Sequence, residues 1–213
     1  MSFLDRLAVR RPDPEPVAAS GWVVDDPVFA TKALRKFLAS LTARESPVLL
    51  DLGPVVGSNV NFFGEQLGCK IFVEDIFANL DQHVRDQTIE ELPPFLKKRL
   101  PQADGTVDGI LCWDLFDYMD RASARELAIQ LTRVLRPGGT LLGFFATSQA
   151  RNTRYTKYVI VDEVNLKHRP YDAARGRQTI LLNRDIIRLF EGLRVSESFL
   201  LQNNLREILF RKP

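Results

Sequence analysis

Apolar and polar positions from residue 48 onward alternate between short apolar runs and longer stretches with helical spacing. Short apolar runs between turn signals are typical of buried strands in a parallel sheet. The runs cover residues 48–50, 70–73, 109–112 and 140–145. The alternation predicts an α/β fold, a doubly wound and mostly parallel sheet with helices on both faces.

Two helices are expected before and between these strands. Pro27 is expected to open the first one, because proline is favoured at the first helical position. Ser123 and Glu126 form an S-x-x-E capping box for the second, and residues 137–139, Pro-Gly-Gly, are expected to end it. Their apolar faces comprise Leu34, Phe37, Leu38 and Leu41, and Leu127, Ala128, Leu131, Val134 and Leu135.

The last part of the chain changes character. Asn183 is a candidate N-cap and Gly192 a candidate stop for a final helix. Residues 195–201 and 205–210 flank a Gln-Asn-Asn turn, and asparagine tolerates positive φ. This pattern predicts a C-terminal antiparallel hairpin that closes the sheet.

Composition supports one ordinary globular domain and narrows the class of protein. The chain has 213 residues, of which 45% are hydrophobic and 26% charged, with a net charge of +2. This charge indicates neither a nucleic-acid nor a membrane partner. Residues 10–20 are rich in proline and charge, so we expect a flexible tail over 1–20 and a single domain over 21–213.

The expected location is the cytoplasm. The N-terminal segment has no continuous apolar core of the kind a signal peptide needs, and no later stretch approaches the length of a membrane helix. Cys69 and Cys112 have no CxxC spacing and are expected to be reduced residues of the core. We expect no metal site, because no cluster of metal ligands is visible.

A glycine-containing loop follows the first strand of the expected sheet. In DLGPVVG, residues 51–57, Gly53 and Gly57 lack a Cβ and allow the backbone to approach a ligand closely. Asp51 ends the strand and is able to order the loop or to accept a hydrogen bond from a ligand. The alternative is that Gly53 only begins a turn.

The chain resembles the class I S-adenosylmethionine-dependent methyltransferases, which have a Rossmann-like fold, over about residues 46–211. Four motifs carry the resemblance, and their order and spacing make it specific. They are DLGPVVG at 51–57, VEDIF at 73–77, LPQADGTVDGILCWDLFDYMD at 100–120 and RVLRPGGTLLGFF at 133–145.

The resemblance implies that the chain binds S-adenosylmethionine and transfers its methyl group. Asp51, Gly53 and Gly57 are the implied cofactor loop. Of Glu74 and Asp75, one acid is implied to accept the two ribose hydroxyls, and Asp75 is preferred because an aliphatic residue follows it directly. Trp113 and Asp114 follow the third strand and are implied to lie beside the methionine part of the cofactor, although Trp113 is equally well explained as a core residue.

Two features depart from the pattern of these methyltransferases. Val55 stands where they most often have the central glycine, and the stretch before Leu100 lacks the acid that binds the adenine amine. Either the loop binds the cofactor in a variant way, which is favoured, or the fold now serves as a non-catalytic binding or interaction module. A nicotinamide dehydrogenase is disfavoured, because the G-x-G-x-x-G spacing is absent.

Residues 151–178 are expected to form an insert on the acceptor side of the cofactor. The segment has seven Lys or Arg against three acids. We expect Arg154, Arg169 and Tyr171 to contact an anionic or aromatic small-molecule acceptor, and His168 to act as the base if one is required. A solvated hairpin with charged edges is the alternative.

Overall fold

The central sheet holds the candidate site in position. The structure, a computed structural model, describes residues 26–147, 154–178, 180–201 and 203–213. Within these residues, six strands form the main sheet in the order β3-β2-β4-β5-β9-β8. Their bounds are β2 Val48–Asp51, β3 Lys70–Val73, β4 Val107–Trp113, β5 Leu135–Ala146, β8 Arg194–Leu200 and β9 Leu205–Arg211.

The direction of the strands confirms the predicted fold class. β3, β2, β4 and β5 pair in parallel, whereas β9 runs antiparallel to both β5 and β8. The predicted C-terminal hairpin is therefore confirmed. In its turn, Asn204 has a φ of 59°, a conformation that asparagine adopts at low cost.

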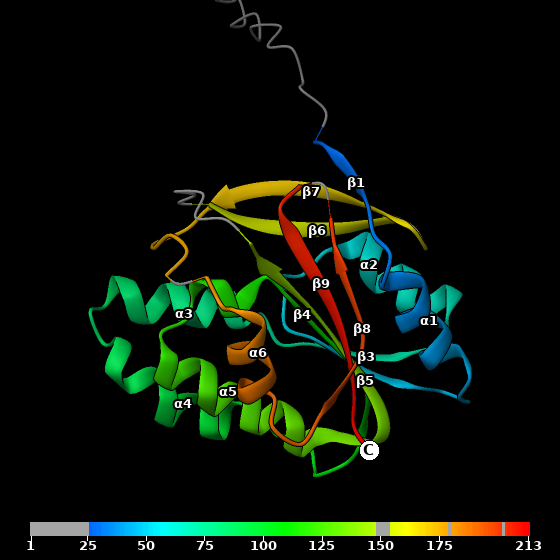
Figure 1. Cartoon of the computed structure of the whole chain (residues 1–213), viewed down its shortest axis with the longest axis horizontal. Helices are drawn as coiled ribbons and strands as arrows, with labels where there is room; N and C mark the ends of the chain where they lie inside the picture. Colours follow the sequence, from blue (N-terminus) through cyan, green and yellow to red (C-terminus); the bar gives the residue numbers. More distant parts are fainter. Residues whose placement is uncertain (1–25, 148–153, 179, 202) are drawn as a thin grey trace, which may run out of the picture.

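Helices cover both faces of this sheet (Figure 1). The helices α1 (Leu34–Thr42) and α2 (Gly57–Asn61) lie on one side, and α2 continues into a π-helical turn (Phe62–Gln66). The other side carries α3 (Ile76–Arg85), α4 (Leu92–Arg99), α5 (Arg121–Val134) and α6 (Asn183–Leu189). Short 3₁₀ turns occupy Ile89–Glu91 and Leu115–Tyr118. The sheet thus separates two apolar clusters.

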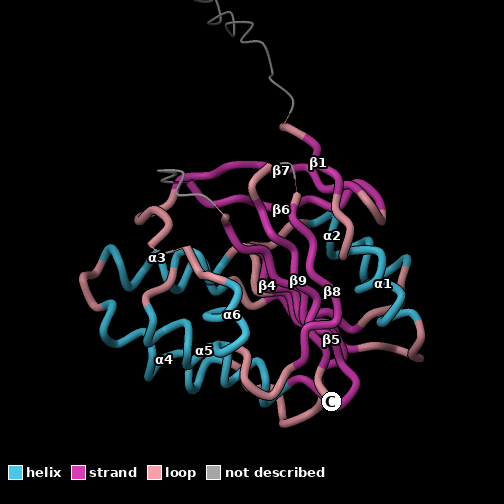
Figure 2. Tube along the Cα trace, viewed as in Figure 1, coloured by secondary structure: helices cyan, strands magenta, loops and turns pink. Residues whose placement is uncertain are grey.

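A second, smaller sheet lies across the carboxyl end of the parallel strands (Figure 2). It contains β1 (Val28–Ala30), β7 (Asn165–Asp172) and β6 (Arg154–Asp162), in that order. β6 and β7 form an antiparallel hairpin in which Tyr158 is opposite His168. Most of the expected acceptor-side insert is this hairpin, and the predicted tail at 1–20 lies outside the described residues.

Several predicted helix boundaries were wrong. Residues 28–30 form a strand that pairs with β7, so the first helix starts at Leu34 and not at Pro27. Asp120 caps α5 by accepting from the amides of Ala122 and Ser123, and it outcompetes the predicted capping box.

The ends of the later helices differ from expectation as well. α5 ends at Val134, and the Pro-Gly-Gly stretch already belongs to extended β5. Leu182 is at the N-cap position of α6, so Asn183 is its first helical residue. The start of β5 depends on its pairing with β4 and β9, which are separate segments of the chain. The Pro-Gly-Gly stretch is only a local signal and does not show this pairing.

Glu207 of β9 attaches the start of α1 to the main sheet. Its side chain is 0% exposed, and its Oε2 accepts hydrogen bonds from the amides of Lys32, at 2.8 Å, and Ala33, at 2.9 Å. A carboxylate suits these amides, because the first N–H groups of a helix have no partner within the helix.

We predict that Glu207→Ala destabilises the fold by about 2 kcal/mol, because one buried and one partly buried amide lose a charged acceptor. Chemical denaturation measures the change. Glu197→Ala is the matched control. Glu197 of β8 pairs at the surface with Lys36 of α1, and the loss of this pair is expected to cost less than about 0.5 kcal/mol. Equal losses would contradict the anchoring role of Glu207.

Candidate functional site

Asp51 lies at the centre of the candidate site, at the carboxyl end of β2. Its side chain is 3% exposed. Its Oδ1 accepts two hydrogen bonds, from the amide of Gly53 at 2.9 Å and from Nε1 of Trp113 at 2.7 Å. Burial raises the pKa of Asp51 to about 6, and the charge of Asp75 adds to this rise.

The two glycines of the loop differ in the space around them. A Cβ at Gly53 would lie 2.7 Å from Cδ1 of Trp113, so the indole fills the space beside this glycine. Gly57 begins α2, and a Cβ there would meet nothing within 4 Å. Val55, the departure from the family pattern, is 63% exposed and does not pack into the core.

The two acids after β3 have different partners. Glu74 pairs with Arg99 and accepts a hydrogen bond from Gln102, at 2.9 Å. Asp75 has a φ of 22° and caps α3, where its Oδ1 accepts from the amide of Ala78 at 3.1 Å. Glu74 is therefore held by Arg99 and Gln102, whereas Asp75 is near enough for its charge to raise the pKa of Asp51.

A buried acidic cluster continues the site beyond β4. Asp114 and Asp117 are both 0% exposed, and Arg177 approaches them at 3.2 Å and 3.4 Å. Each acid has an Oδ1 that is buried without a hydrogen-bond partner among the described residues. Burial raises the pKa of Asp114, and burial together with the charge of Asp114 raises the pKa of Asp117 to about 7.

Aromatic rings enclose this cluster. The hydroxyl of Tyr118 donates to the backbone oxygen of Arg154 at 2.9 Å, and the guanidinium of Arg177 lies 5.7 Å from the centre of its ring. Tyr158 of β6 stacks on Trp113 with centroids 5.1 Å apart, and its hydroxyl lowers the pKa of Asp114 by a hydrogen bond. The second sheet therefore contributes one wall of the site.

The residues expected to contact the acceptor are dispersed along the β6–β7 hairpin. Tyr171 is near enough to Asp75 and Asp114 for their charges, after burial, to raise its pKa. Arg154 and Arg169 form exposed ion pairs with Asp172 and Asp26. His168 packs between the rings of Phe29 and Tyr158, and burial lowers its pKa to about 4, so it is neutral at physiological pH.

The structure thus brings together only part of the predicted set. Asp51, Gly53 and Trp113 are in contact, with Asp75, Asp114 and Tyr171 close by, and Gly57 begins α2 at the end of the same loop. His168 lies behind Tyr158, and Glu74, Arg154 and Arg169 are engaged in ion pairs. Sequence reasoning missed Asp117, Tyr118, Tyr158 and Arg177. The D-x-x-D-Y spacing of 114–118 could have indicated the first two, but no local signal marks Arg177, which is far from Asp114 in the sequence.

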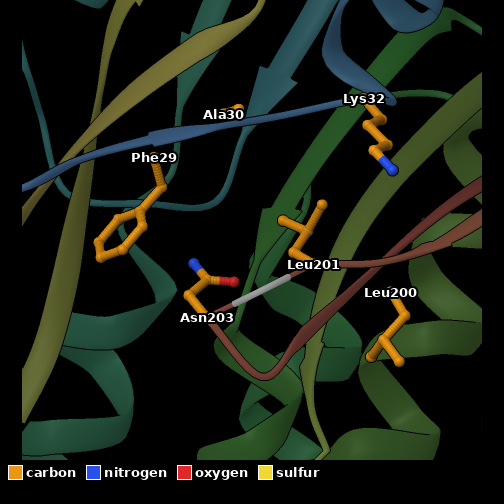
Figure 3. Close-up of a pocket in the computed structure, with 6 residues that line it drawn as sticks. All are labelled: Phe29, Ala30, Lys32, Leu200, Leu201 and Asn203. Atoms are coloured by element: carbon orange, nitrogen blue, oxygen red, sulfur yellow. The ribbon is translucent and has the colours of Figure 1, made fainter.

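Pockets elsewhere on the described surface have other chemistry. One of about 250 Å³ lies between β1 and the turn after β8 (Figure 3), and another of about 400 Å³ lies between the starts of α5 and α6. The first is lined by Phe29, Ala30, Lys32, Leu200, Leu201 and Asn203. Neither contains a residue of the predicted site.

The described residues contain no group of three or more His, Cys, Asp or Glu side chains able to hold a metal ion. None of the helices among them has the length and apolar character to cross a membrane. Cys69 and Cys112 are both buried and free, which confirms their prediction as reduced core residues.

Comparisons with known proteins agree with the fold. Residues 50–143, less than half of the chain, match a family model described as a methyltransferase domain. No curated protein sequence matches the chain.

Three solved structures with a similar fold are described as methyltransferases. An S-adenosylmethionine-dependent methyltransferase from Aquifex aeolicus is 14% identical, with 83% of this chain and 88% of that chain covered and a TM-score of 0.50. One from Clostridium acetobutylicum is 13% identical, with 84% and 90% covered and a TM-score of 0.53. The 1,6-didemethyltoxoflavin-N1-methyltransferase of Burkholderia thailandensis, crystallised with 1,6-didemethyltoxoflavin and S-adenosylhomocysteine, is 16% identical, with 84% and 78% covered and a TM-score of 0.51.

The domain match and the shared architecture agree with each other. Residues 50–143 match a methyltransferase domain, the chain has the Rossmann-like fold of the class I enzymes, and S-adenosylmethionine-dependent methyltransferase is the enzyme class that these findings support. The resemblance inferred from the four motifs is confirmed. At these identities the solved structures speak for the fold and not for a particular substrate.

We predict that ionisation of Asp51 and Asp117 lowers the free energy of unfolding as the pH rises from about 4 to about 7, and that the lowered pKa of His168, about 4, offsets part of this loss below pH 6.5. Asp51 and Asp117 have folded pKa values of about 6 and about 7, above the ordinary 3.8. The folded state therefore binds more protons in this range, and stability is lost as these acids ionise. The neutral amide in Asp51→Asn retains an acceptor oxygen, so this variant is expected to be more stable than wild type at pH 8, by on the order of 1–3 kcal/mol, and not at pH 4.

Chemical denaturation of wild type and of Asp51→Asn from pH 4 to pH 8 measures the difference in their free energies of unfolding. Asp172→Asn is the control, because the Asp172 side chain is 93% exposed and its charge is solvated. A constant difference between Asp51→Asn and wild type at all pH values would contradict the raised pKa of Asp51.

Proposed function

We propose that the chain transfers a methyl group from S-adenosylmethionine to a small-molecule acceptor at the carboxyl edge of β2, β3 and β4. One observation carries the proposal. Asp51, Asp75 and Asp114 lie at the carboxyl ends of three neighbouring parallel strands within the segment that matches a methyltransferase domain. Ligands of open α/β sheets bind at this edge.

Asp75 is the residue proposed to hold the ribose. Its carboxylate is able to accept from two vicinal hydroxyls, and its contact with the Ala78 amide involves one oxygen. The loop from Gly53 to Gly57 and the first amides of α2 would face the rest of the cofactor. When bound, S-adenosylmethionine supplies an electrophilic methyl group on a sulfonium, so alignment of the acceptor accounts for much of the catalysis.

Two parts of the loop region suit S-adenosylmethionine, and one does not. Asp75 and the open start of α2 would accommodate the cofactor, whereas the Trp113 indole fills the space beside Gly53. Cofactor binding in this position therefore requires the indole to move. The proposal therefore remains that this loop binds the cofactor in a variant way. The side chain that obstructs the cofactor is Trp113 and not Val55.

The charge of the cluster favours a nitrogen acceptor, neutral or cationic, with an aromatic surround. Asp114 and Asp117 face one cation, Arg177, and tyrosine rings line the cluster. An anionic acceptor would lack a counter-charge here, because Arg154 and Arg169 pair with acids at the surface. Asp117, with a pKa of about 7, is a better candidate than His168 to accept a proton released from such a nitrogen.

A non-catalytic binding module is the second candidate. The specific observation in its favour is the contact between Trp113 and the loop, which leaves Asp51 with protein donors. Absence of S-adenosylhomocysteine binding, in wild type and in variants that remove the indole, would favour this candidate.

We predict that Asp75→Asn weakens the binding of S-adenosylhomocysteine by about tenfold or more, because an amide offers one acceptor oxygen where the carboxylate offers two charged ones. Isothermal titration calorimetry measures the affinity. Glu74→Gln is the matched control, since it alters the adjacent acid and its pairing with Arg99, and it is expected to change the affinity by less than about threefold. The ribose assignment is wrong if the two variants bind equally well.

We predict that methyl transfer from tritiated S-adenosylmethionine favours aryl and heteroaryl amines over benzoates of similar size. The reason is the acidic, tyrosine-lined cluster around Asp114. Asp117→Asn is expected to lower turnover by about a hundredfold if Asp117 accepts the proton. Its control is Asp104→Asn at an exposed ion pair. Label recovered as methyl esters would contradict the nitrogen assignment.

A further inference from the structure

The backbone at the end of β4 directs the Trp113 side chain in an unusual way. Trp113 has a φ of 51°, in the left-handed region that large side chains rarely adopt. The pairing of β4 with β5 shifts register between Leu111 and Trp113. Irregularities of this kind redirect a side chain, and strained backbone concentrates at functional sites.

The indole of Trp113 makes three sets of contacts in this position. Its Nε1 donates to Oδ1 of Asp51, its face stacks on Tyr158 with an interplanar angle of 6°, and its edge meets Phe144 at 5.7 Å between centroids. The side chain is 3% exposed. An aromatic ring with a hydrogen bond at its N–H is thus well held beside Gly53.

The second sheet is fixed against the same loop. Asn59 of α2 donates from Nδ2 to the backbone oxygen of Tyr158, at 2.8 Å, and accepts at Oδ1 from the amide of Ile160, at 2.9 Å. Its side chain is 2% exposed. Because Asn59 follows Gly57 by two residues, the ring stacked on Trp113 is tied to the helix that starts at the loop.

We propose that the Trp113 indole is an internal competitor of the cofactor. In the state described here, it occupies the part of the cofactor site beside Gly53, and S-adenosylmethionine binds only when the indole moves away from Asp51 and Tyr158. The inference rests on the proposed function, since it assigns the loop to that cofactor. Binding of the cofactor and packing of the indole are then mutually exclusive.

Calorimetry with S-adenosylhomocysteine tests the competition. Trp113→Ala is expected to bind the ligand about tenfold more tightly than wild type or better, because the competing ring is gone. Trp113→Phe is expected to fall between them, since phenylalanine retains a ring but lacks the N–H that bonds Asp51. Leu142→Ala is the matched control, a truncation in the same apolar cluster, and it should bind like wild type.

A fluorescence measurement keeps the test independent of the stability of these variants. The chain has two tryptophans, so Trp22→Phe leaves Trp113 as the only reporter. Saturating S-adenosylhomocysteine is expected to shift the emission of this variant to the red as the indole leaves its buried position.

The outcomes separate the inference from the proposed function. Equal, measurable affinity of wild type and Trp113→Ala, or binding without a change in emission, overturns the competition and leaves the methyltransferase proposal intact. Absence of binding by wild type and by folded Trp113→Ala overturns the proposed function, and the inference with it. Tighter binding by Trp113→Ala together with the red shift supports both.

Discussion

The carboxylate of Asp51 connects the loop after β2 to the end of β4, and the rest of the candidate site is arranged around this connection. A buried acid is costly unless donors surround it. Here the donors are the amide of Gly53 and the indole of Trp113, which fix the path of the loop and the position of the ring. Even with both bonds, burial holds the pKa of Asp51 at about 6.

This arrangement concentrates buried polar groups at one edge of the sheet. Asp114, Asp117 and Arg177 form a buried cluster directly after Trp113, and both acids retain buried oxygen atoms without partners in the described part of the chain. Such groups lower stability, so their retention calls for a functional reason. Substrate recognition or proton transfer at the carboxyl end of β4 provides one.

The small sheet of β1, β7 and β6 gives the site its specific character. Tyr158 of this sheet contacts Trp113 and Asp114. Asn59 of α2 donates a hydrogen bond to the backbone oxygen of Tyr158 and so holds the sheet against α2. The parallel sheet is shared with the solved methyltransferases, whereas in the proposed function this wall would supply the rings and charges that an acceptor meets. Solved structures that are 13–16% identical to this chain share its architecture. The chemistry of this wall must therefore be inferred from the chain's own residues.

The sequence by itself determined the four parallel strands, the C-terminal hairpin, the reduced cysteines and the loop that begins at Asp51. These features follow from short-range periodicity and glycine positions, which are local properties of the chain. Helix boundaries were less predictable, because Asp120 and strand pairing replaced the expected caps.

Only the tertiary structure decided which residues meet at the site. Arg177 reaches Asp114 from an irregular segment after β7, and Tyr158 reaches Trp113 from a different sheet. The direction of the Trp113 ring depends on a register shift and a positive φ, neither of which has a signal in the sequence. Contacts between distant segments depend on the packing of the whole chain, and for that reason local patterns could name Trp113 and Asp51 as candidates but could not show that one is hydrogen-bonded to the other.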